Sequence, residues 1–161
     1  MTEVSINKQA RLSEHFTLAE MCKTSAKTAD GNIPSHVHIE NMKRLCGWLE
    51  MLRSEWNKRY GEGDDPIVIN SGYRSEAVNK AVGGVKGSNH LTGCAADIRV
   101  AGIEQLVRYA TILLDISDES QEDFDELLLE RSPRGGYWLH FAVRPPSQEN
   151  RRKVSLIQSL R

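Results

Sequence analysis

The sequence predicts an α+β domain in which helices flank a small, largely antiparallel sheet. Two long stretches carry apolar residues at helical spacing, and several short apolar runs lie between clusters of turn-forming residues. The chain has 161 residues, which is enough for one hydrophobic core and too few for two comfortable ones. We therefore expect one domain of the α+β class over residues 1–161.

The first part of the chain is predicted to form an arm and two helices. Residues 1–16 are expected to be an N-terminal arm, after which Thr17 and Glu20 have the spacing of a capping box and predict a short helix. A polar loop follows. A long amphipathic helix is then expected over residues 35–60, because apolar residues recur at three- and four-residue steps: Ile39, Met42, Leu45, Leu49, Leu52 and Trp56.

Shorter elements are predicted in the middle of the chain, where apolar runs alternate with helical patterns and glycines. In order, we expect a strand over 67–70, a helix that Ser75 caps and Gly83 ends, a loop over 85–93, a strand over 95–100 and a helix over 103–116.

The last part of the chain is predicted to contain a β-hairpin. Residues 124–130 and 137–143 are the expected strands, joined by a turn rich in proline and glycine at 132–136. Two consecutive prolines then end the sheet, and a tail helix is expected over 145–161.

Composition excludes several classes of function. The formal net charge is -1, from 21 basic and 22 acidic residues, so nucleic-acid binding has no support. No apolar run approaches the length of a membrane span, and we expect no membrane insertion. The three cysteines are widely spaced and predict neither a disulfide framework nor a thiolate zinc site. We expect a monomer. We also expect synthesis in the cytoplasm, because the first residues show no signal peptide.

Three residues predict a metal site. His90 and Asp97 lie seven positions apart in Ser88-Asn-His-Leu-Thr-Gly-Cys-Ala-Ala-Asp97, and His140 belongs to a distant strand. Two imidazoles and one carboxylate form the ligand set that a catalytic zinc ion uses when its fourth position stays open for water. Such a site would form only in the folded protein. Taken alone, His140 would be a buried, hydrogen-bonded histidine, and the other two residues favour a metal ligand.

The strand that carries His140 has two different faces. Side chains alternate along a strand, so Trp138 and His140 share one face while Leu139 and Phe141 share the other. The second face is apolar and suits the core. The first places an imidazole beside a large aromatic ring, so we expect Trp138 to form a hydrophobic wall that contacts substrate.

Longer motifs resemble those of a known family. They are Ile69-Asn-Ser-Gly-Tyr-Arg-Ser75, then the run that ends at Gly84, then the segment from Ser88 to Asp97, and finally Trp138-Leu-His140. In this order they resemble the M15 zinc D-alanyl-D-alanine peptidases, most closely the compact subgroup of phages and bacteria with the Hedgehog/DD-peptidase fold. The resemblance covers roughly residues 12–143.

The resemblance implies roles for the residues that match its motifs. His90, Asp97 and His140 would be the zinc ligands. Arg74 would bind substrate and stabilise an oxyanion or hold a carboxylate, as a guanidinium can; the alternative is a surface salt bridge. Ser88 would hydrogen-bond to substrate, and the alternative is a turn-forming serine.

The general base is the point at which the sequence departs from the family pattern. Many M15 members have a glutamate three residues before the last histidine, where this chain has Tyr137. The compact subgroup takes the carboxylate from the preceding strand, which implies Glu130. Glu126 lies on the same strand face and is the second candidate, whereas Asp125 points the other way. The alternative for Glu130 is an exposed residue at a strand end.

These expectations together predict a zinc metallopeptidase that hydrolyses an amide bond in peptidoglycan stem peptides. It would be a D-Ala-D-Ala carboxypeptidase or an endolysin-type endopeptidase, with a zinc-activated water, Glu130 as base, and zinc and Arg74 at the oxyanion. A holin or another route would bring it to the cell wall. The alternative is a non-catalytic zinc domain that binds wall peptides or serves in a phage structure. A third hypothesis, thiol chemistry at Cys94, would require activity without a metal.

Overall fold

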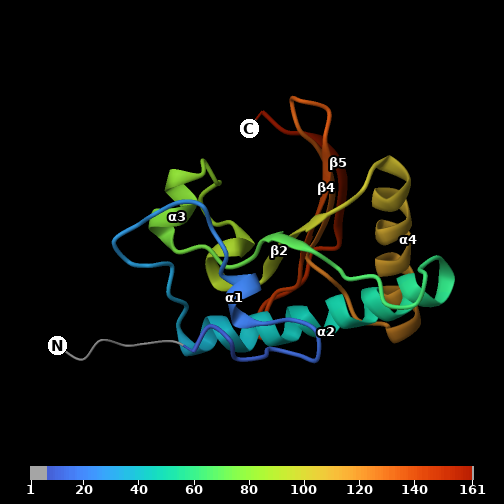
Figure 1. Ribbon diagram of the computed structural model, residues 1–161, viewed down its shortest axis with the longest axis horizontal. Helices are drawn as coiled ribbons and strands as arrows, with labels where there is room; N and C mark the ends of the chain where they lie inside the picture. Colours follow the sequence, from blue (N-terminus) through green and yellow to red (C-terminus); the bar gives the residue numbers. More distant parts are fainter. Residues whose placement is uncertain (1–6, 161) are drawn as a thin grey trace.

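The computed structural model describes residues 7–160 and confirms an α+β fold with a mostly antiparallel sheet (Figure 1). In chain order its elements are α1 (Leu18–Met21), α2 (His36–Arg59), β1 (Ile69–Ser71), α3 (Glu76–Ala81), the 3₁₀ helix η1 (Asn89–Thr92), β2 (Ala95–Arg99), α4 (Ile103–Ser120), β3 (Glu126–Arg131), β4 (Tyr137–Ala142) and β5 (Lys153–Gln158).

The five strands lie in the order β1-β2-β4-β3-β5. The first three neighbouring pairs are antiparallel, and β5 runs parallel to β3 at one edge of the sheet. The β3–β4 pair is the predicted hairpin, in which Glu126 pairs with Ala142 and Arg131 with Tyr137. The pairing of β2 with β4 brings together two segments that are distant in the sequence.

The prediction of a tail helix over residues 145–161 is wrong. Residues 153–158 form β5, and they alternate Lys-Val-Ser-Leu-Ile-Gln with one side chain in two on each face of the sheet. The strand completes the hydrogen bonding of β3, which would otherwise have an open edge. Its ends are held by Lys153 N, which donates to Asp125 O at 2.9 Å, and by Ser159 N, which donates to Arg131 O at 2.8 Å.

Other predicted elements are confirmed with shifted ends. Ser35 caps α2, and Ser75 caps α3 by accepting a hydrogen bond from Val78 N. The strand expected at 67–70 begins two residues later, and the helix expected to end at 116 continues to Ser120. The loop expected over 85–93 contains η1. The first six residues of the expected arm lie outside the described range.

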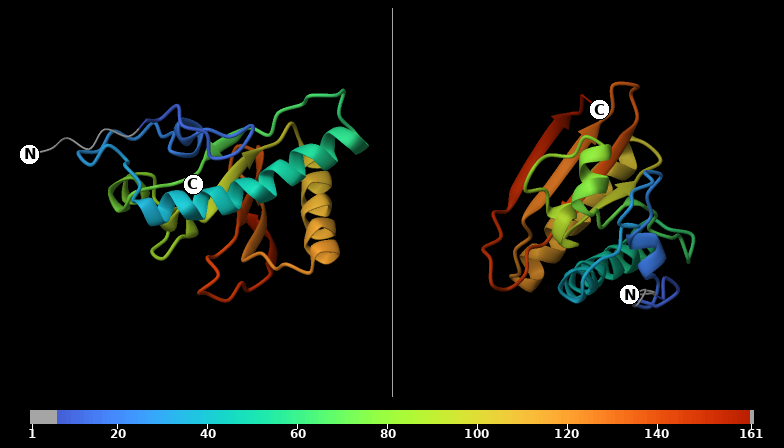
Figure 2. Two further views of the ribbon diagram at one scale, coloured as in Figure 1. Left: turned by 90° about the horizontal axis from the view of Figure 1, so that it is seen from below. Right: turned by 90° about the vertical axis from the view of Figure 1, so that its left-hand side faces the viewer.

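The hydrophobic core lies between the sheet and the two long helices. α2 and α4 pack against each other and against the sheet, and the rings of Trp48 and Phe141 lie 5.4 Å apart between their centroids. The same strand face carries Leu139. Viewed nearly edge-on, the sheet has α4 on one side and α3 on the other (Figures 1 and 2). The face away from the long helices therefore remains available for polar side chains.

None of the helices described over residues 7–160 combines the length and the apolar character needed to cross a lipid bilayer.

Candidate metal centre

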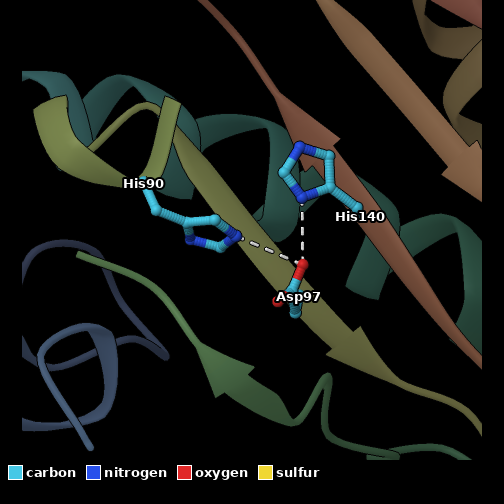
Figure 3. A group of neighbouring side chains, drawn as sticks. All are labelled: His90, Asp97 and His140. Atoms are coloured by element: carbon cyan, nitrogen blue, oxygen red, sulfur yellow. Dashed lines mark hydrogen bonds and ion pairs between the residues drawn. The ribbon is translucent and has the colours of Figure 1, made fainter. Parts of the chain in front are cut away.

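His90, Asp97 and His140 come together on the polar face of the sheet (Figure 3). Nε2 of His90 lies 3.3 Å from Oδ1 of Asp97, and Nδ1 of His140 lies 3.0 Å from the same oxygen. One ligand atom from each residue lies within 4.8 Å of the other two. Three donor atoms from η1, β2 and β4 thus point at one small volume.

The register of the sheet explains how Asp97 meets His140. The two residues are direct partners in the antiparallel pairing of β2 with β4. Their neighbours Ile98 and Leu139 are also partners, and both are fully buried in the core. Because side chains alternate along a strand, core packing of Ile98 and Leu139 directs Asp97 and His140 to the opposite face.

His90 is held by the short helix η1 and by a neighbouring loop. Its backbone N–H donates to Oγ of Ser88 at 3.2 Å, and Gly93 ends η1 with a φ of 76°. A Cβ at Gly93 would lie 2.6 Å from the carbonyl oxygen of His38, so only glycine fits there. Nδ1 of His90 lies 2.7 Å from the carbonyl oxygen of Gly72. A carbonyl oxygen can only accept a hydrogen bond, so Nδ1 of His90 carries the hydrogen and Nε2 keeps a lone pair that can bind a metal ion.

The electrostatics of the three groups suit a cation. Burial lowers the pKa of His90. Burial also acts to lower the pKa of His140, but hydrogen bonds to Asp97 and Glu126 outweigh it and raise this pKa to about 9. Burial raises the pKa of Asp97, and the two histidines more than offset that effect and hold it well below its usual range. Asp97 therefore stays ionised and His90 stays neutral, and a donor set of one carboxylate and two imidazoles fits a zinc ion.

The site opens into a cavity of about 460 Å³ between the α3–η1 segment and the sheet. The cavity is lined by the three triad residues and by other residues that the sequence singled out: Arg74, Ser88, Glu126 and Glu130. A ligand in this cavity would therefore contact the open side of the triad. Trp138 is not among the described residues that line it.

Arg74 lies at the edge of the triad. Its Nη2 donates to Oδ2 of Asp97 at 3.2 Å, and its Nε donates to Oγ of Ser71 at 3.0 Å. The side chain is only 9% exposed, so the alternative of a surface salt bridge does not describe it. The guanidinium both orients a triad carboxylate and faces the cavity.

Glu130 and Trp138 form a cross-strand pair on the polar face. They are direct partners between β3 and β4, and Nε1 of Trp138 donates to Oε2 of Glu130 at 2.9 Å. Glu130 is only 8% exposed, which differs from an exposed strand end. Its role as base and the contact of Trp138 with substrate stay predictions.

Glu126 contacts a triad histidine. Oε1 of Glu126 lies 3.1 Å from Nε2 of His140 and accepts a hydrogen bond from Nδ2 of Asn89 at 2.7 Å. No sequence pattern marked Asn89 beyond its place beside His90. The amide of Asn89 connects two segments that pair only in the folded chain, so sequence spacing alone could not identify it.

Ser88 and Cys94 have structural contacts near the triad. Ser88 accepts the hydrogen bond from His90 N, as the turn-forming alternative proposed, and it also lines the cavity. Its contact with substrate stays a prediction. Cys94 is fully buried, and burial raises the pKa of its thiol. A thiol in that state is a poor nucleophile.

Comparison with known proteins gives two matches. A family model described as Peptidase M15 matches residues 14–116, a range that includes His90 and Asp97. The zinc D-Ala-D-Ala carboxypeptidase of Streptomyces albus G is 31% identical over 84 residues. That alignment covers 52% of this chain and 31% of the relative. The chain therefore matches about a third of the length of this relative.

Proposed function

We propose that this chain, which belongs to the peptidase M15 family, is a zinc-dependent peptidase that hydrolyses an amide bond in peptidoglycan stem peptides. The observation that carries the proposal is the convergence of His90 Nε2, Asp97 Oδ1 and His140 Nδ1 on the wall of a cavity. The name of the relative supports both the metal and the substrate class.

The triad would hold the zinc ion through two imidazole nitrogens and one carboxylate oxygen. A bound zinc ion supplies a Lewis acid that makes a water nucleophilic near neutral pH and polarises the scissile carbonyl. Asp97 is suited to this task because its carboxyl stays ionised. His90 is suited because Gly72 O fixes the orientation of its ring.

Glu130 is the proposed general base. Its carboxylate would accept a proton from the attacking water and deliver it to the leaving amine nitrogen. Trp138 holds one of its carboxylate oxygens at 2.9 Å, which limits the positions that the side chain can take. Such orientation is what proton transfer requires.

Arg74 is the residue proposed to bind either the oxyanion or the terminal carboxylate of the substrate. A guanidinium makes charge-assisted hydrogen bonds to either ligand. In a carboxypeptidase it would bind the terminal carboxylate of the peptide, and in an endopeptidase it would face the carbonyl oxygen. Lys86 and Lys153 also line the cavity, and their charge supports a substrate that carries carboxylates.

A non-catalytic zinc domain that binds wall peptides is the second candidate. Tyr137 favours it, because Tyr137 stands three residues before His140, where many relatives carry the catalytic glutamate. Glu130→Ala separates the two candidates. In an enzyme it abolishes turnover and leaves the zinc bound, whereas in a binding domain peptide affinity changes little.

The proposal is tested by mass spectrometry of purified peptidoglycan fragments after incubation with zinc-loaded protein. A sample treated with a chelator is the control. We expect loss of a terminal D-alanine or cleavage within the stem only when zinc is present, and the product mass names the bond. Intact fragments beside a protein that retains one zinc would contradict the peptidase and favour the binding domain.

A further inference from the structure

We propose that Glu126 is a positioning residue that fixes the His140 ring for the metal, and that Asn89 and Asp125 hold Glu126 in place. This inference rests on the proposed metal site. It assigns to Glu126 a role other than that of general base, for which it was the second candidate.

The two nitrogens of His140 face different partners. Nδ1 lies 3.0 Å from Oδ1 of Asp97 inside the triad, and Nε2 lies 3.1 Å from Oε1 of Glu126 outside it. A neutral imidazole has one N–H and one lone pair. If Nδ1 gives its lone pair to the metal, Nε2 carries the hydrogen and donates it to Glu126. A carboxylate at this position fixes both the tautomer and the orientation of a ligand histidine.

Glu126 is itself held by an amide. Nδ2 of Asn89 lies 2.7 Å from Oε1 of Glu126 and 2.7 Å from Oδ2 of Asp125. An amide NH₂ has two hydrogens, so Asn89 can donate one to each carboxylate. Oε1 of Glu126 therefore accepts hydrogen bonds from both Asn89 and His140, and its Oε2 forms an ion pair with Nη2 of Arg151 at 3.8 Å. These contacts hold the carboxylate in one orientation.

The far end of this chain of hydrogen bonds is anchored by arginines. Asp125 has no exposed surface, and Arg151 donates to its two oxygens from Nε at 3.0 Å and from Nη2 at 2.8 Å. Nε of Arg144 forms an ion pair with Oδ2 at 3.1 Å. A buried carboxylate paired in this way is expensive to move. Asp125 therefore holds the side-chain amide of Asn89 in a fixed position.

Asn89 connects two of the three ligands. It is the first residue of η1 and directly precedes His90 in the chain, while its side chain reaches Glu126 beside His140. The backbone carbonyl oxygen of Asn89 also accepts a hydrogen bond from Cys94 N at 3.0 Å, directly before β2. Changes at Asn89 or Glu126 are therefore expected to reach the metal through the orientation of its ligands.

The test is zinc affinity, measured by competition with a chromogenic chelator. We expect Glu126→Ala to bind zinc about 10- to 100-fold more weakly than the wild type. Glu126→Gln should stay close to wild type, because its carbonyl oxygen still accepts from Nε2 of His140. Glu130→Ala is the matched control, since it changes a glutamate on the same strand face and should leave zinc affinity unchanged. If Glu126→Ala does not fold, Glu126→Leu replaces it. Leucine keeps the side-chain volume but has no hydrogen-bond acceptor, so we expect the same loss of zinc affinity, about 10- to 100-fold.

A second readout uses cobalt in place of zinc. The visible absorption of bound Co²⁺ reports ligand geometry, and we expect it to change in Glu126→Ala and to return in Glu126→Gln. Wild-type zinc affinity in both Glu126→Ala and Glu126→Leu would overturn the inference while leaving the proposed function intact. A Glu126→Gln protein that binds zinc normally but hydrolyses nothing would identify Glu126 as the base and also overturn it. A wild-type protein that binds no zinc would instead refute the proposed function.

Discussion

Asp97 and His140 face each other directly across β2 and β4, with 3.0 Å between Oδ1 and Nδ1, although they are 43 positions apart in the sequence. Their meeting depends on the pairing of two strands whose other faces are buried in the core. A bound metal would stabilise the folded state by its affinity for this pair and for His90, because the unfolded chain has no such site.

Removing any triad ligand should remove the metal. We expect His90→Ala, Asp97→Ala and His140→Ala each to lose the single zinc that the wild type retains after dialysis, as measured by elemental mass spectrometry. His15→Ala is the control. His15 belongs to a group with Glu14 and half-buried Glu50 that could also offer metal ligands, and loss of zinc in this variant alone would place the metal there instead.

Glu130→Gln should separate chemistry from metal binding. The amide keeps an acceptor for Trp138 but cannot take a proton, so we expect the turnover number to fall by about 10²- to 10⁴-fold. Zinc content and peptide KM should stay near the wild-type values. The measurement is steady-state hydrolysis of a defined stem peptide, and wild-type turnover would exclude Glu130 as the base.

Arg74→Lys should reduce stabilisation of the transition state more than it reduces the stability of the fold. Lysine keeps the charge but loses the planar fork that contacts Asp97 and Ser71. We expect kcat/KM to fall by about 10²- to 10³-fold, the usual cost of losing an oxyanion donor. Comparison of peptide substrates with a free and an amidated C-terminus shows which ligand Arg74 binds. An equal kcat/KM for Arg74→Lys and wild type would exclude Arg74 from both roles.

Most of the fold could be predicted from local patterns. The helical spacing of Met42, Leu45 and Leu49 identified α2, and the alternation in residues 137–143 identified β4 and the side of the sheet to which His140 points. Such local patterns are enough to predict an element because each one reflects a single buried face of a helix or strand.

β5 was missed because its pairing is non-local. Val154 and Leu156 are both exposed, so no buried face marks the strand. Its partner β3 is separated from it in the sequence by β4. The contact of Glu126 with His140 was missed for the same kind of reason. Alternation places Glu126 and Glu130 on one face, and the hairpin register pairs His140 with Leu128, midway between them. The contact of Glu126 with His140 therefore depends on side-chain conformation and on the hydrogen bond from Asn89.

Asp125 should make the free energy of unfolding depend on pH in the acid range. Burial acts to raise its pKa, but hydrogen bonds from Arg151 and Asn89 outweigh burial and lower the pKa to about 2. A carboxyl with a lowered folded-state pKa stabilises the protein above its unfolded pKa of about 3.9, and this contribution is lost as the pH falls toward the folded-state value.

The measurement is the free energy of unfolding in urea between about pH 5 and pH 2, for the wild type and Asp125→Asn. We expect the wild type to lose on the order of 2 kcal/mol more than the variant over this range. Carboxyls that share no partner with Asp125 titrate in both proteins and cancel in the comparison. Parallel curves for the two proteins would show that Asp125 is not held by these hydrogen bonds.

The most direct test of the proposed function is a zinc titration of the metal-free protein with stem-peptide hydrolysis as the readout. We expect no hydrolysis without zinc, a rate that rises linearly with added zinc, and a plateau at one equivalent per chain. His140→Ala should stay inactive throughout. Hydrolysis by the metal-free protein, or one tightly bound zinc without any hydrolysis, would contradict a zinc peptidase at His90, Asp97 and His140.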